Sequence, residues 1–266
     1  MEESIITSTQ NAKVKHVVAL QQKSAQRRKE GLFVVEGRRE LMHCVEAGYE
    51  IAECFVLDKL ADLADLAPLG SLESLVSLVS PQVYEKMAYR GSTEGVIAVV
   101  RERQRSLDDL QLSASPLIMV LERVEKPGNL GAVLRSADAA KADAVIICDP
   151  LTDLYNPNLI RSSIGAIFSV PCVACSSEDC IAFLKARGIQ ILTAQLQDSS
   201  LYYDTDMLQG TAIVMGTEST GLTEVWRQAA DAHIRIPMLG QLDSLNVSVS
   251  AAILLFEAVR QRNSKK

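Results

Sequence analysis

The chain has 266 residues, which suits two ordinary domains or one large one, and its 48% hydrophobic and 23% charged residues exclude a disordered chain. Its formal net charge of −6 excludes a uniformly basic nucleic-acid binder. No apolar run approaches the ~18 residues of a membrane span, and the N-terminal segment MEESIITSTQ is too acidic and polar for a secretory signal, so we expect a cytoplasmic protein with no membrane partner.

The first hundred residues predict a short α/β domain. We expect a basic helix near 11–29, a strand at 32–36, a helix at 38–48 and further strands at 53–57 and 95–100. Basic side chains concentrate in its first part, where few acidic residues oppose them: Lys13, Lys15, Lys23, Arg27, Arg28, Lys29, Arg38 and Arg39. Such a patch can meet phosphate groups even on an acidic protein, or it can be a solvated helix face. Charge alone does not choose between these two interpretations.

The amino-acid composition changes along the chain and divides it into two parts. Residues 104–116 are charged and contain several serines, and we interpret them as a linker between a domain of residues 1–103 and a domain of residues 117–266. From Leu117 onward, apolar strands alternate with helical stretches, which is typical of a parallel sheet covered on both faces. The expected strands are 117–122, 144–148, 189–194, 211–216 and 233–237, and the expected helices lie near 129–141, 177–187, 222–230 and 246–262.

Ligands of parallel α/β sheets bind in loops beyond the carboxyl ends of the strands, so the loops after 122, 194, 216 and 237 are the candidates for chemistry. In the first loop, two glycines flank Asn129 where a strand gives way to a helix, and Arg135 follows within two turns. Glycines there let the backbone approach a ligand, and a helix N-terminus attracts anions. In a later loop, Glu218 follows Gly216 among glycine and threonine residues. Taken alone, each loop is more simply a turn followed by a capped helix.

The last loop places a polar cluster at the start of an otherwise apolar helix, in the sequence DSLNVSVSAAILLFEA (243–258). An N-cap at Asp243 or Ser244 explains one polar residue. It does not explain why Asn246, Ser248 and Ser250 continue into the helix, because a buried polar group without a partner costs ~1–3 kcal/mol. The pattern therefore predicts a partner, which is a neighbouring loop, a ligand or another subunit.

Together, the three loops resemble the three ordered motifs of the SpoU (TrmH) family of RNA ribose 2′-O-methyltransferases, within the SPOUT superfamily. The resemblance rests on N-x-G-x-x-x-R at 129–135, on MGTESTGL at 215–222 and on IPMLGQLDSLNVSVSAAILLFE at 236–257, in which SLNVSVS is the most specific stretch. It implies an α/β catalytic domain with a parallel-type sheet and a deep trefoil knot, working as a homodimer through the C-terminal domain. The first domain resembles the family's RNA substrate-binding domain through GLFVVEGRREL (31–41) and STEGVIAVV (92–100), which implies an L30e/L7Ae-like α/β fold.

The resemblance also implies a cofactor, S-adenosylmethionine, and methyl transfer to a ribose 2′-hydroxyl of RNA. The implied cofactor-binding residues are Ala194, Gln195, Gly216, Ile236, Leu245 and Asn246, and the implied catalytic residues are Asn129, Arg135, Glu218, Ser244 and Asn246. For RNA binding we expect Lys13, Lys15, Arg27, Arg28, Arg38, Arg39 and Arg135. In the family, the counterpart of Arg135 is the proposed base. A guanidinium keeps its proton at physiological pH, so we favour Arg135 as a grip on the phosphate beside the target ribose, with Asn246 holding the loops together.

The two-domain layout resembles family members that act on 23S ribosomal RNA more than the shorter tRNA enzymes, so ribosomal RNA is the favoured substrate and tRNA the alternative. A non-catalytic RNA-binding or ribosome assembly factor is a second alternative, disfavoured because the catalytic positions are present. An NAD-binding enzyme is disfavoured because no G-x-G-x-x-G follows a strand. We expect no metal site, because Cys172 and Cys175, with Cys180 after them, lack a fourth ligand at zinc spacing. The six cysteines are best explained as small core residues, and Trp226 as a packing residue.

Overall fold

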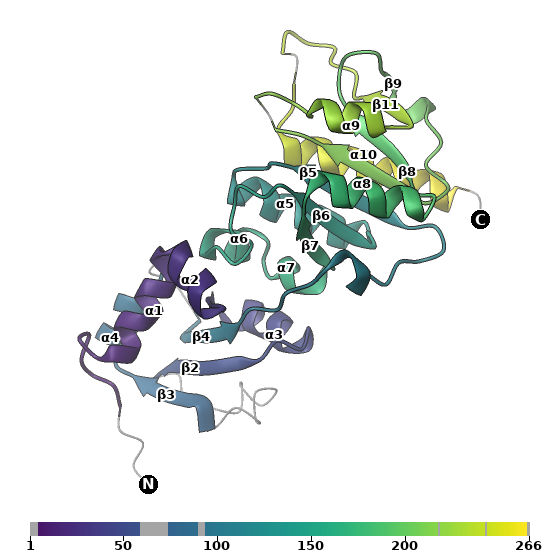
Figure 1. The fold of residues 1–266 in the computed structure, drawn as a ribbon. Helices are drawn as coiled ribbons and strands as arrows, with labels where there is room; N and C mark the ends of the chain where they lie inside the picture. Colours follow the sequence, from purple (N-terminus) through teal and green to yellow (C-terminus); the bar gives the residue numbers. More distant parts are fainter. Residues whose placement is uncertain (1–4, 59–73, 90–93, 218, 243, 265–266) are drawn as a thin grey trace. The chain divides into compact units, whose positions relative to one another are not determined.

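The computed structural model describes residues 5–58, 74–89, 94–217, 219–242 and 244–264, and the chain forms two compact units (Figure 1). The first unit comprises Met1–Gln104 and Asp153–Ser169, and the second comprises Arg105–Thr152 and Val170–Lys266. Residues 153–169, which follow the expected linker in sequence, therefore pack with the N-terminal part of the chain. Within the described ranges, no helix is long and apolar enough to cross a membrane.

The first unit is built on a mixed four-stranded sheet of order β1-β4-β2-β3. Strand β4 runs antiparallel to β1 and to β2, whereas β3 runs parallel to β2. Its elements are α1 (Ala12–Gln22), α2 (Ser24–Glu30), β1 (Leu32–Glu36), α3 (Arg38–Glu46), β2 (Ile51–Leu57), β3 (Val76–Val79), α4 (Pro81–Met87), β4 (Val96–Arg101), α6 (Pro157–Ser162) and α7 (Ala166–Ser169). The strands predicted for this domain are confirmed. The sequence analysis did not predict β3 and α4, because both elements are short.

The single helix predicted near 11–29 is wrong, because the chain breaks into α1 and α2 at Lys23, whose backbone is extended (φ −119°, ψ 106°). The break places the Arg27 side chain under the end of α1. There its Nη1 donates to the carbonyl oxygens of Leu20, at 2.5 Å, and of Gln21, at 3.1 Å. The guanidinium therefore satisfies carbonyl groups that a helix end leaves without intrahelical partners.

The second unit is built on a seven-stranded sheet of order β7-β6-β5-β10-β8-β11-β9, in which every neighbouring pair runs parallel. The prediction of an α/β fold with a parallel sheet is confirmed. The elements are β5 (Leu117–Glu122), α5 (Pro127–Ala139), β6 (Ala144–Cys148), β7 (Cys172–Cys175), α8 (Ser177–Ala186), β8 (Gln190–Ala194), β9 (Ser200–Leu201), β10 (Thr211–Met215), α9 (Glu224–Ala229), β11 (Ala232–Arg235) and α10 (Val247–Asn263), with short 3-10 turns at Leu107–Asp109 and Tyr202–Asp204.

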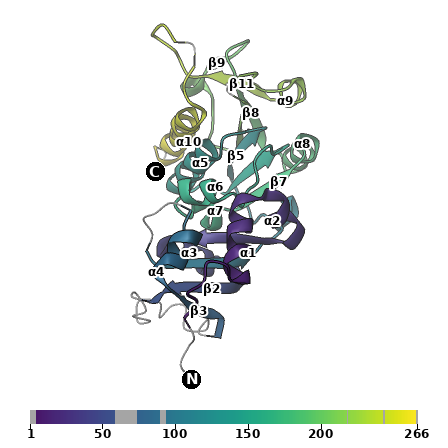
Figure 2. The ribbon, with the colours of Figure 1, turned by 90° about the vertical axis from the view of Figure 1, so that its left-hand side faces the viewer.

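Helices cover both faces of this sheet. Figure 2 shows α5 and α10 on one face and α8 and α9 on the other. All six residues of β5 are buried as a result, which is why its first five residues are all apolar and do not alternate with polar ones. On the α8–α9 face, Trp226 is fully buried and its indole Nε1 donates to Ser177 Oγ at 2.9 Å. This confirms Trp226 as a packing residue.

All six cysteines carry free thiols, and five of them are buried. Three belong to the second unit's core, where the sulfur atoms of Cys148, Cys175 and Cys180 lie within 4.8 Å of one another at the ends of β6 and β7 and on α8. Cys148 and Cys175 are partners in the register of two neighbouring parallel strands, so their side chains point to the same face.

Candidate functional site

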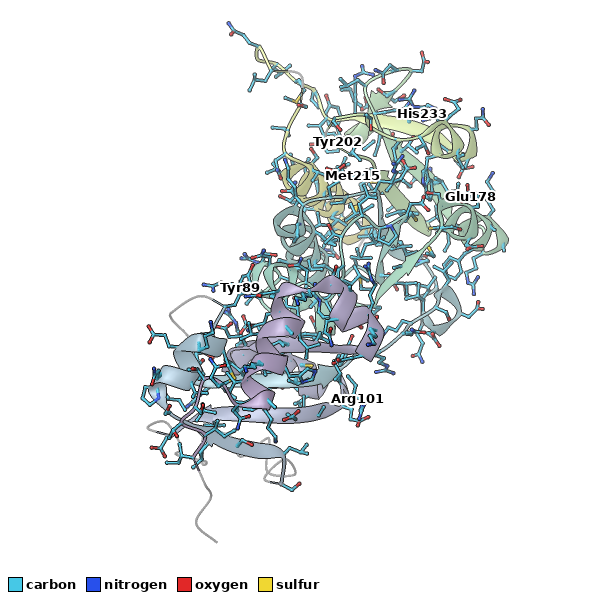
Figure 3. All side chains as sticks on the ribbon, turned by 60° about the vertical axis from the view of Figure 1, so that its left-hand side comes forward. Tyr89, Arg101, Glu178, Tyr202, Met215 and His233 are labelled. Atoms are coloured by element: carbon cyan, nitrogen blue, oxygen red, sulfur yellow. The ribbon has the colours of Figure 1, made fainter. Side chains whose placement is uncertain are left out.

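The loops beyond the carboxyl ends of three neighbouring strands, β10, β8 and β11, surround a cavity of about 430 Å³ in the second unit. Met215, the last residue of β10, lines this cavity and is labelled in Figure 3. The first turns of α10 close the cavity through Val247 and Ser250. The cavity brings together six residues singled out from the sequence: Ala194, Gln195, Gly216, Ile236, Ser244 and Leu245.

Gly216 makes the turn after β10 possible. Thr217 and Gly221 exchange two backbone hydrogen bonds, of 3.2 and 3.1 Å, so the chain folds back tightly on itself. A Cβ on Gly216 would lie 2.3 Å from the carbonyl carbon and oxygen of Gly221 and 2.5 Å from the nitrogen of Leu222. Gly221 itself adopts a left-handed backbone (φ +68°), which glycine adopts without strain. Both glycines are therefore required by the loop's own backbone.

A buried carboxylate ties this loop to the rest of the sheet. Glu122, the last residue of β5, is 1% exposed, and its two oxygens accept hydrogen bonds from the Thr223 backbone nitrogen (2.8 Å) and hydroxyl (2.6 Å). Thr223 is the N-cap of α9. The carboxylate thus occupies the helix N-terminus, where a negative charge is favourable, and holds the far end of the glycine-rich loop against β5.

Asn246 joins two of the candidate loops. Its Nδ2 donates to Asn129 Oδ1 at 3.1 Å, while its own Oδ1 accepts from the Ser248 backbone nitrogen at 2.9 Å and hydroxyl at 2.6 Å. Asn246 is the N-cap of α10, a position that the sequence had suggested for Asp243 or Ser244. Of the polar residues at the start of this helix, Asn246 therefore has a partner at the start of α5, whereas the Ser248 hydroxyl bonds back to Asn246.

A second, smaller cavity of about 130 Å³ adjoins the first. Asn129 lines it together with the loop after β5, and four residues line both cavities: Gly216, Thr217, Ser219 and Val247. Asn129 therefore lines a cavity that shares part of its wall with the larger cavity. This arrangement suits two ligands that react with each other, one in each cavity.

Two of the expected catalytic residues, Arg135 and Asn246, line neither cavity. Arg135 lies on α5, is exposed and lines neither cavity, and its guanidinium makes no hydrogen bond or ion pair within the described part of the chain. Glu218 lies outside the described residues. Of the expected catalytic residues, Asn129 and Ser244 therefore line the cavities, and Asn246 bonds to Asn129.

Sequence reasoning missed Arg227, which lies on α9 and lines the larger cavity. On the sequence it looks like an ordinary surface arginine. One signal in the sequence points to the site: Arg227 lies near the start of the helix that follows the glycine-rich loop. Residues near that helix N-terminus face the loops at the carboxyl edge of the sheet.

The basic residues expected to bind RNA differ in their availability. Lys15 on α1 and Arg28 on α2 are exposed and make no hydrogen bond or ion pair within the described ranges. Lys13 and Arg39 pair with the carboxylates of Glu53 and Glu40, whereas the Arg38 guanidinium donates to the backbone oxygen of Glu94. Pairing with a carboxylate lowers the net positive charge that the surface can offer to phosphate groups.

Arg27 is 4% exposed, so the expectation that it contacts RNA is not met. Its Nε and Nη2 bond to Asp153 Oδ2 at 2.7 and 2.6 Å, in addition to the carbonyl oxygens at the end of α1. Buried arginines are stable only when they are paired and hydrogen-bonded in this way. Arg27 therefore anchors the segment that begins at Asp153 to the rest of the first unit.

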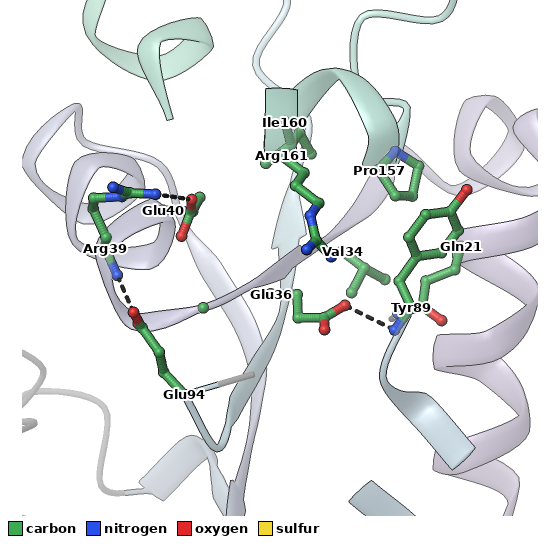
Figure 4. A pocket seen from close by; sticks show the side chains of 11 residues that line it. Gln21, Val34, Glu36, Arg39, Glu40, Tyr89, Glu94, Pro157, Ile160 and Arg161 are labelled. Atoms are coloured by element: carbon green, nitrogen blue, oxygen red, sulfur yellow. Dashed lines mark hydrogen bonds and ion pairs between the residues drawn. The ribbon is translucent and has the colours of Figure 1, made fainter. Parts of the chain in front are cut away.

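A polar pocket of about 240 Å³ lies within the first unit. Figure 4 shows Arg39 bonded to Glu40 and Glu94 at one side of it, and Glu36 bonded to the backbone of Tyr89 at the other. Arg161 extends from α6 toward Val34 between them. Carboxylates and guanidinium groups alternate around the pocket, so it carries no single sign of charge.

Comparison with known proteins gives this site a context. The model of the SpoU rRNA Methylase family matches residues 116–256, and the model of the MRM3-like substrate binding domain matches residues 11–98. The 23S rRNA (uridine(2479)-2′-O)-methyltransferase of Streptomyces viridochromogenes is 36% identical over 176 residues, which cover 64% of this chain and 61% of that protein. The chain thus spans less than two thirds of that relative's length.

Two further proteins match nearly end to end. The 23S rRNA (guanosine(2553)-2′-O)-methyltransferase RlmP of Bacillus subtilis is 28% identical over 251 residues, covering 94% of this chain and 97% of that protein. The crystal structure of an AdoMet-bound rRNA methyltransferase from Sinorhizobium meliloti has a TM-score of 0.88 and 29% identity, and the match covers 97% of both chains. The resemblance drawn from the three motifs is confirmed, and because the family model matches more than half of the sequence, this chain belongs to the SpoU rRNA methylase family.

Proposed function

We propose that this protein transfers a methyl group from S-adenosylmethionine to a ribose 2′-hydroxyl of 23S ribosomal RNA. The observation that carries the proposal is the pair of adjoining cavities at the carboxyl edge of the parallel sheet, one lined by the strand-end loops and one by Asn129. The 23S rRNA substrates of both curated relatives favour ribosomal RNA over tRNA.

The larger cavity suits the cofactor in its size and in the groups that it presents. A volume of about 430 Å³ falls within the range of ~300–1,000 Å³ typical of small-molecule sites. Gly216 exposes backbone in its wall, and Ala194, Ile236 and Leu245 add small or apolar side chains. These residues would hold the cofactor, which supplies a methyl group on a positively charged sulfur. The protein's own task is then to position and orient the 2′-hydroxyl that accepts the methyl group.

Asn129 is the residue best placed for that task. Its Oδ1 accepts a hydrogen bond from the Asn246 amide, which fixes the orientation of its side chain beside the smaller cavity. Ser244, in the wall of the larger cavity, adds a hydroxyl on the other side. Arg135 stands outside the cavities on α5, and its exposed guanidinium suits a phosphate of the bound RNA better than it suits proton removal from the hydroxyl. Glu218 keeps its expected place among the catalytic residues as part of this proposal.

The first unit would capture the RNA. We assign to it the L30e/L7Ae-like fold that its sequence resembles, which its mixed sheet with helices supports. Lys15 and Arg28 are exposed and unpaired within the described residues, and they would contribute to the sequence-independent attraction to phosphates, with a strong dependence on salt. Lys13 and Arg39 can contribute only after exchanging a glutamate carboxylate for a phosphate.

We extend the family's trefoil knot, homodimer and cytoplasmic location to this chain as part of the proposal. Support for the knot comes from α10, which returns from β11 to pack on α5 and against β5 and β10. Support for a second copy comes from large apolar side chains on α10 and the loop before it that face solvent, among them Leu239, which is 96% exposed, Leu242, Val249 and Phe256. Exposed apolar groups in this number are typical of an interface.

A methyl-transfer assay tests the proposal. Tritiated S-adenosylmethionine is incubated with ribosomal RNA, assembled ribosomal subunits or tRNA from a strain that lacks the gene, and the labelled nucleotide is mapped. We expect label at one ribose 2′-oxygen of 23S rRNA, lost with Asn129→Ala. Label in tRNA alone would move the substrate to the alternative class, and cofactor binding without transfer to any RNA would favour a non-catalytic binding factor.

The role of Arg135 is tested by the pH dependence of the rate. If Arg135 grips a phosphate, Arg135→Ala lowers kcat/KM for RNA but leaves the shape of the pH–rate profile unchanged. If it acts as the base, the limb of the profile that reports the base disappears with the substitution. A Lys15→Ala variant serves as a control, since it removes a cation from the first unit and changes RNA affinity only.

A further inference from the structure

Two polar groups in the wall of the larger cavity have no hydrogen-bond partner. Gln195 Oε1 and Arg227 Nε are both buried, and neither bonds to any described residue. Gln195 follows β8, Arg227 lies on α9, and α9 packs against β8. The two groups thus belong to one side of the cavity.

A hydrogen bond fixes the orientation of the Gln195 side-chain amide and leaves its oxygen without a donor. Its Nε2 donates to the backbone oxygen of Gln197 at 2.9 Å, so Oε1 is the end that has no donor. The neighbouring Arg235 gives a contrast, because it also lines the cavity but donates to Ser199 Oγ at 3.4 Å. Among the cavity's charged side chains in the described ranges, Arg227 is therefore the cation without a partner.

The buried Arg227 Nε and Gln195 Oε1 are both costly to leave without a partner, and the cost is larger for the atom that belongs to a charged group. No aspartate or glutamate of the described residues lines the cavity to neutralise Arg227. A ligand that completes this wall must present an anion for Arg227 to donate to and an N–H or O–H donor for Gln195 Oε1. A free amino-acid end, with its carboxylate and ammonium groups on one carbon atom, presents both.

We propose that Arg227 and Gln195 bind the amino-acid end of S-adenosylmethionine, with the guanidinium donating to the α-carboxylate and Gln195 Oε1 accepting from the α-ammonium group. This inference rests on the proposed function and adds to it the residues that recognise the non-adenine end of the cofactor. It makes the site selective for nucleosides that carry the amino acid over thioether nucleosides that lack it.

Two ligands separate this role from a merely structural one. S-adenosylhomocysteine carries the amino-acid end, and 5′-methylthioadenosine has the same adenosine and a thioether sulfur but neither carboxylate nor ammonium group. Binding of each to the full chain is measured by titration calorimetry, without RNA, for the wild type and for Arg227→Met, Gln195→Met and Arg187→Met. The last variant is the control, because it removes a cation of the same unit that lies outside the cavity and pairs with Asp108.

We expect Arg227→Met to weaken S-adenosylhomocysteine binding by about 10- to 100-fold, since a hydrogen bond between charged groups is lost. We expect Gln195→Met to weaken it by about 3- to 10-fold. Binding of 5′-methylthioadenosine should change by less than about twofold in both variants, and Arg187→Met should change neither ligand by more than about twofold. The preference for the ligand with the amino acid should therefore collapse only when Arg227 or Gln195 is replaced.

Three results would overturn the inference. An equal loss of both ligands in Arg227→Met would mean that the substitution deforms the cavity. Unchanged S-adenosylhomocysteine binding, with weaker binding of RNA, would assign Arg227 to an RNA phosphate. Both results leave the proposed function standing, because the wild type still binds S-adenosylhomocysteine. A wild type that binds neither ligand overturns the proposed function and this inference together.

Discussion

Replacing Gly216 by alanine tests whether the turn after β10 shapes the cofactor cavity. The added Cβ would lie 2.3 Å from the Gly221 carbonyl group, whereas ordinary contacts begin at 3.4 Å, so the loop must retreat by about 1 Å. The obstacle is backbone, which cannot move aside as a flexible side chain does. The retreat breaks the two backbone hydrogen bonds between Thr217 and Gly221, each of which contributes about 0.5–1.5 kcal/mol.

With the strain of overpacking added, at about 1–3 kcal/mol, Gly216→Ala should lower the free energy of unfolding by about 2–6 kcal/mol. Because the displaced segment lines the cavity, affinity for S-adenosylhomocysteine should fall at least about tenfold. Thermal unfolding and titration calorimetry measure the two effects. Gly240→Ala is the control, since nothing lies within 4 Å of a Cβ at that position. If Gly216→Ala behaves like Gly240→Ala in both assays, the argument from steric conflict is refuted.

Three further substitutions test other contacts. Asn246→Asp keeps an N-cap for α10 but replaces the amide that donates to the neighbouring asparagine of α5 by an acceptor. The rate of methyl transfer should therefore fall at least about tenfold, while the free energy of unfolding changes by less than about 0.5 kcal/mol. An unchanged rate of methyl transfer would contradict this reasoning. Arg27→Met leaves the buried Asp153 carboxylate without its partner, and the free energy of unfolding should fall by about 3–5 kcal/mol, measured by urea denaturation. Hydrogen bonds from Arg260 lower the pKa of Glu257 below its ordinary value of 4.5. The ionised Glu257 therefore contributes its full stabilisation of the fold above about pH 5, and this contribution is lost as the pH falls through the lowered pKa. The difference in free energy of unfolding between the wild type and Glu257→Gln should shrink below pH 4.5.

The strands of the second unit could be predicted because the sequence that forms them is unambiguous. A strand buried on both faces, such as β5 or β6, is a continuous apolar run bounded by polar loops, and few other structures use that pattern. The short elements were missed because four or fewer residues carry too little periodicity. Examples are β3, which takes its place by pairing with β2, and β9, which pairs with β11.

The candidate site could be predicted in part for a similar reason. Asn129, Gly216 and Asn246 stand in motifs at strand ends, and a parallel sheet brings its carboxyl ends to one edge whatever the order of its strands. Arg227 could not be found in this way, because its unpaired state depends on which groups surround it after folding. Arg27 was misassigned for the opposite reason, because its partner Asp153 is more than a hundred residues away in the sequence.

The sequence by itself determined the fold class, through local patterns of apolar residues, and the family, through the three motifs that resemble it. Only the tertiary structure decided which polar groups meet. It joined Asn246 to Asn129, buried Arg27 against Asp153 and left Arg227 without a partner. The physical reason is that burial and pairing set the free energy of a charged or polar group, and both are properties of the surrounding space rather than of neighbours along the chain.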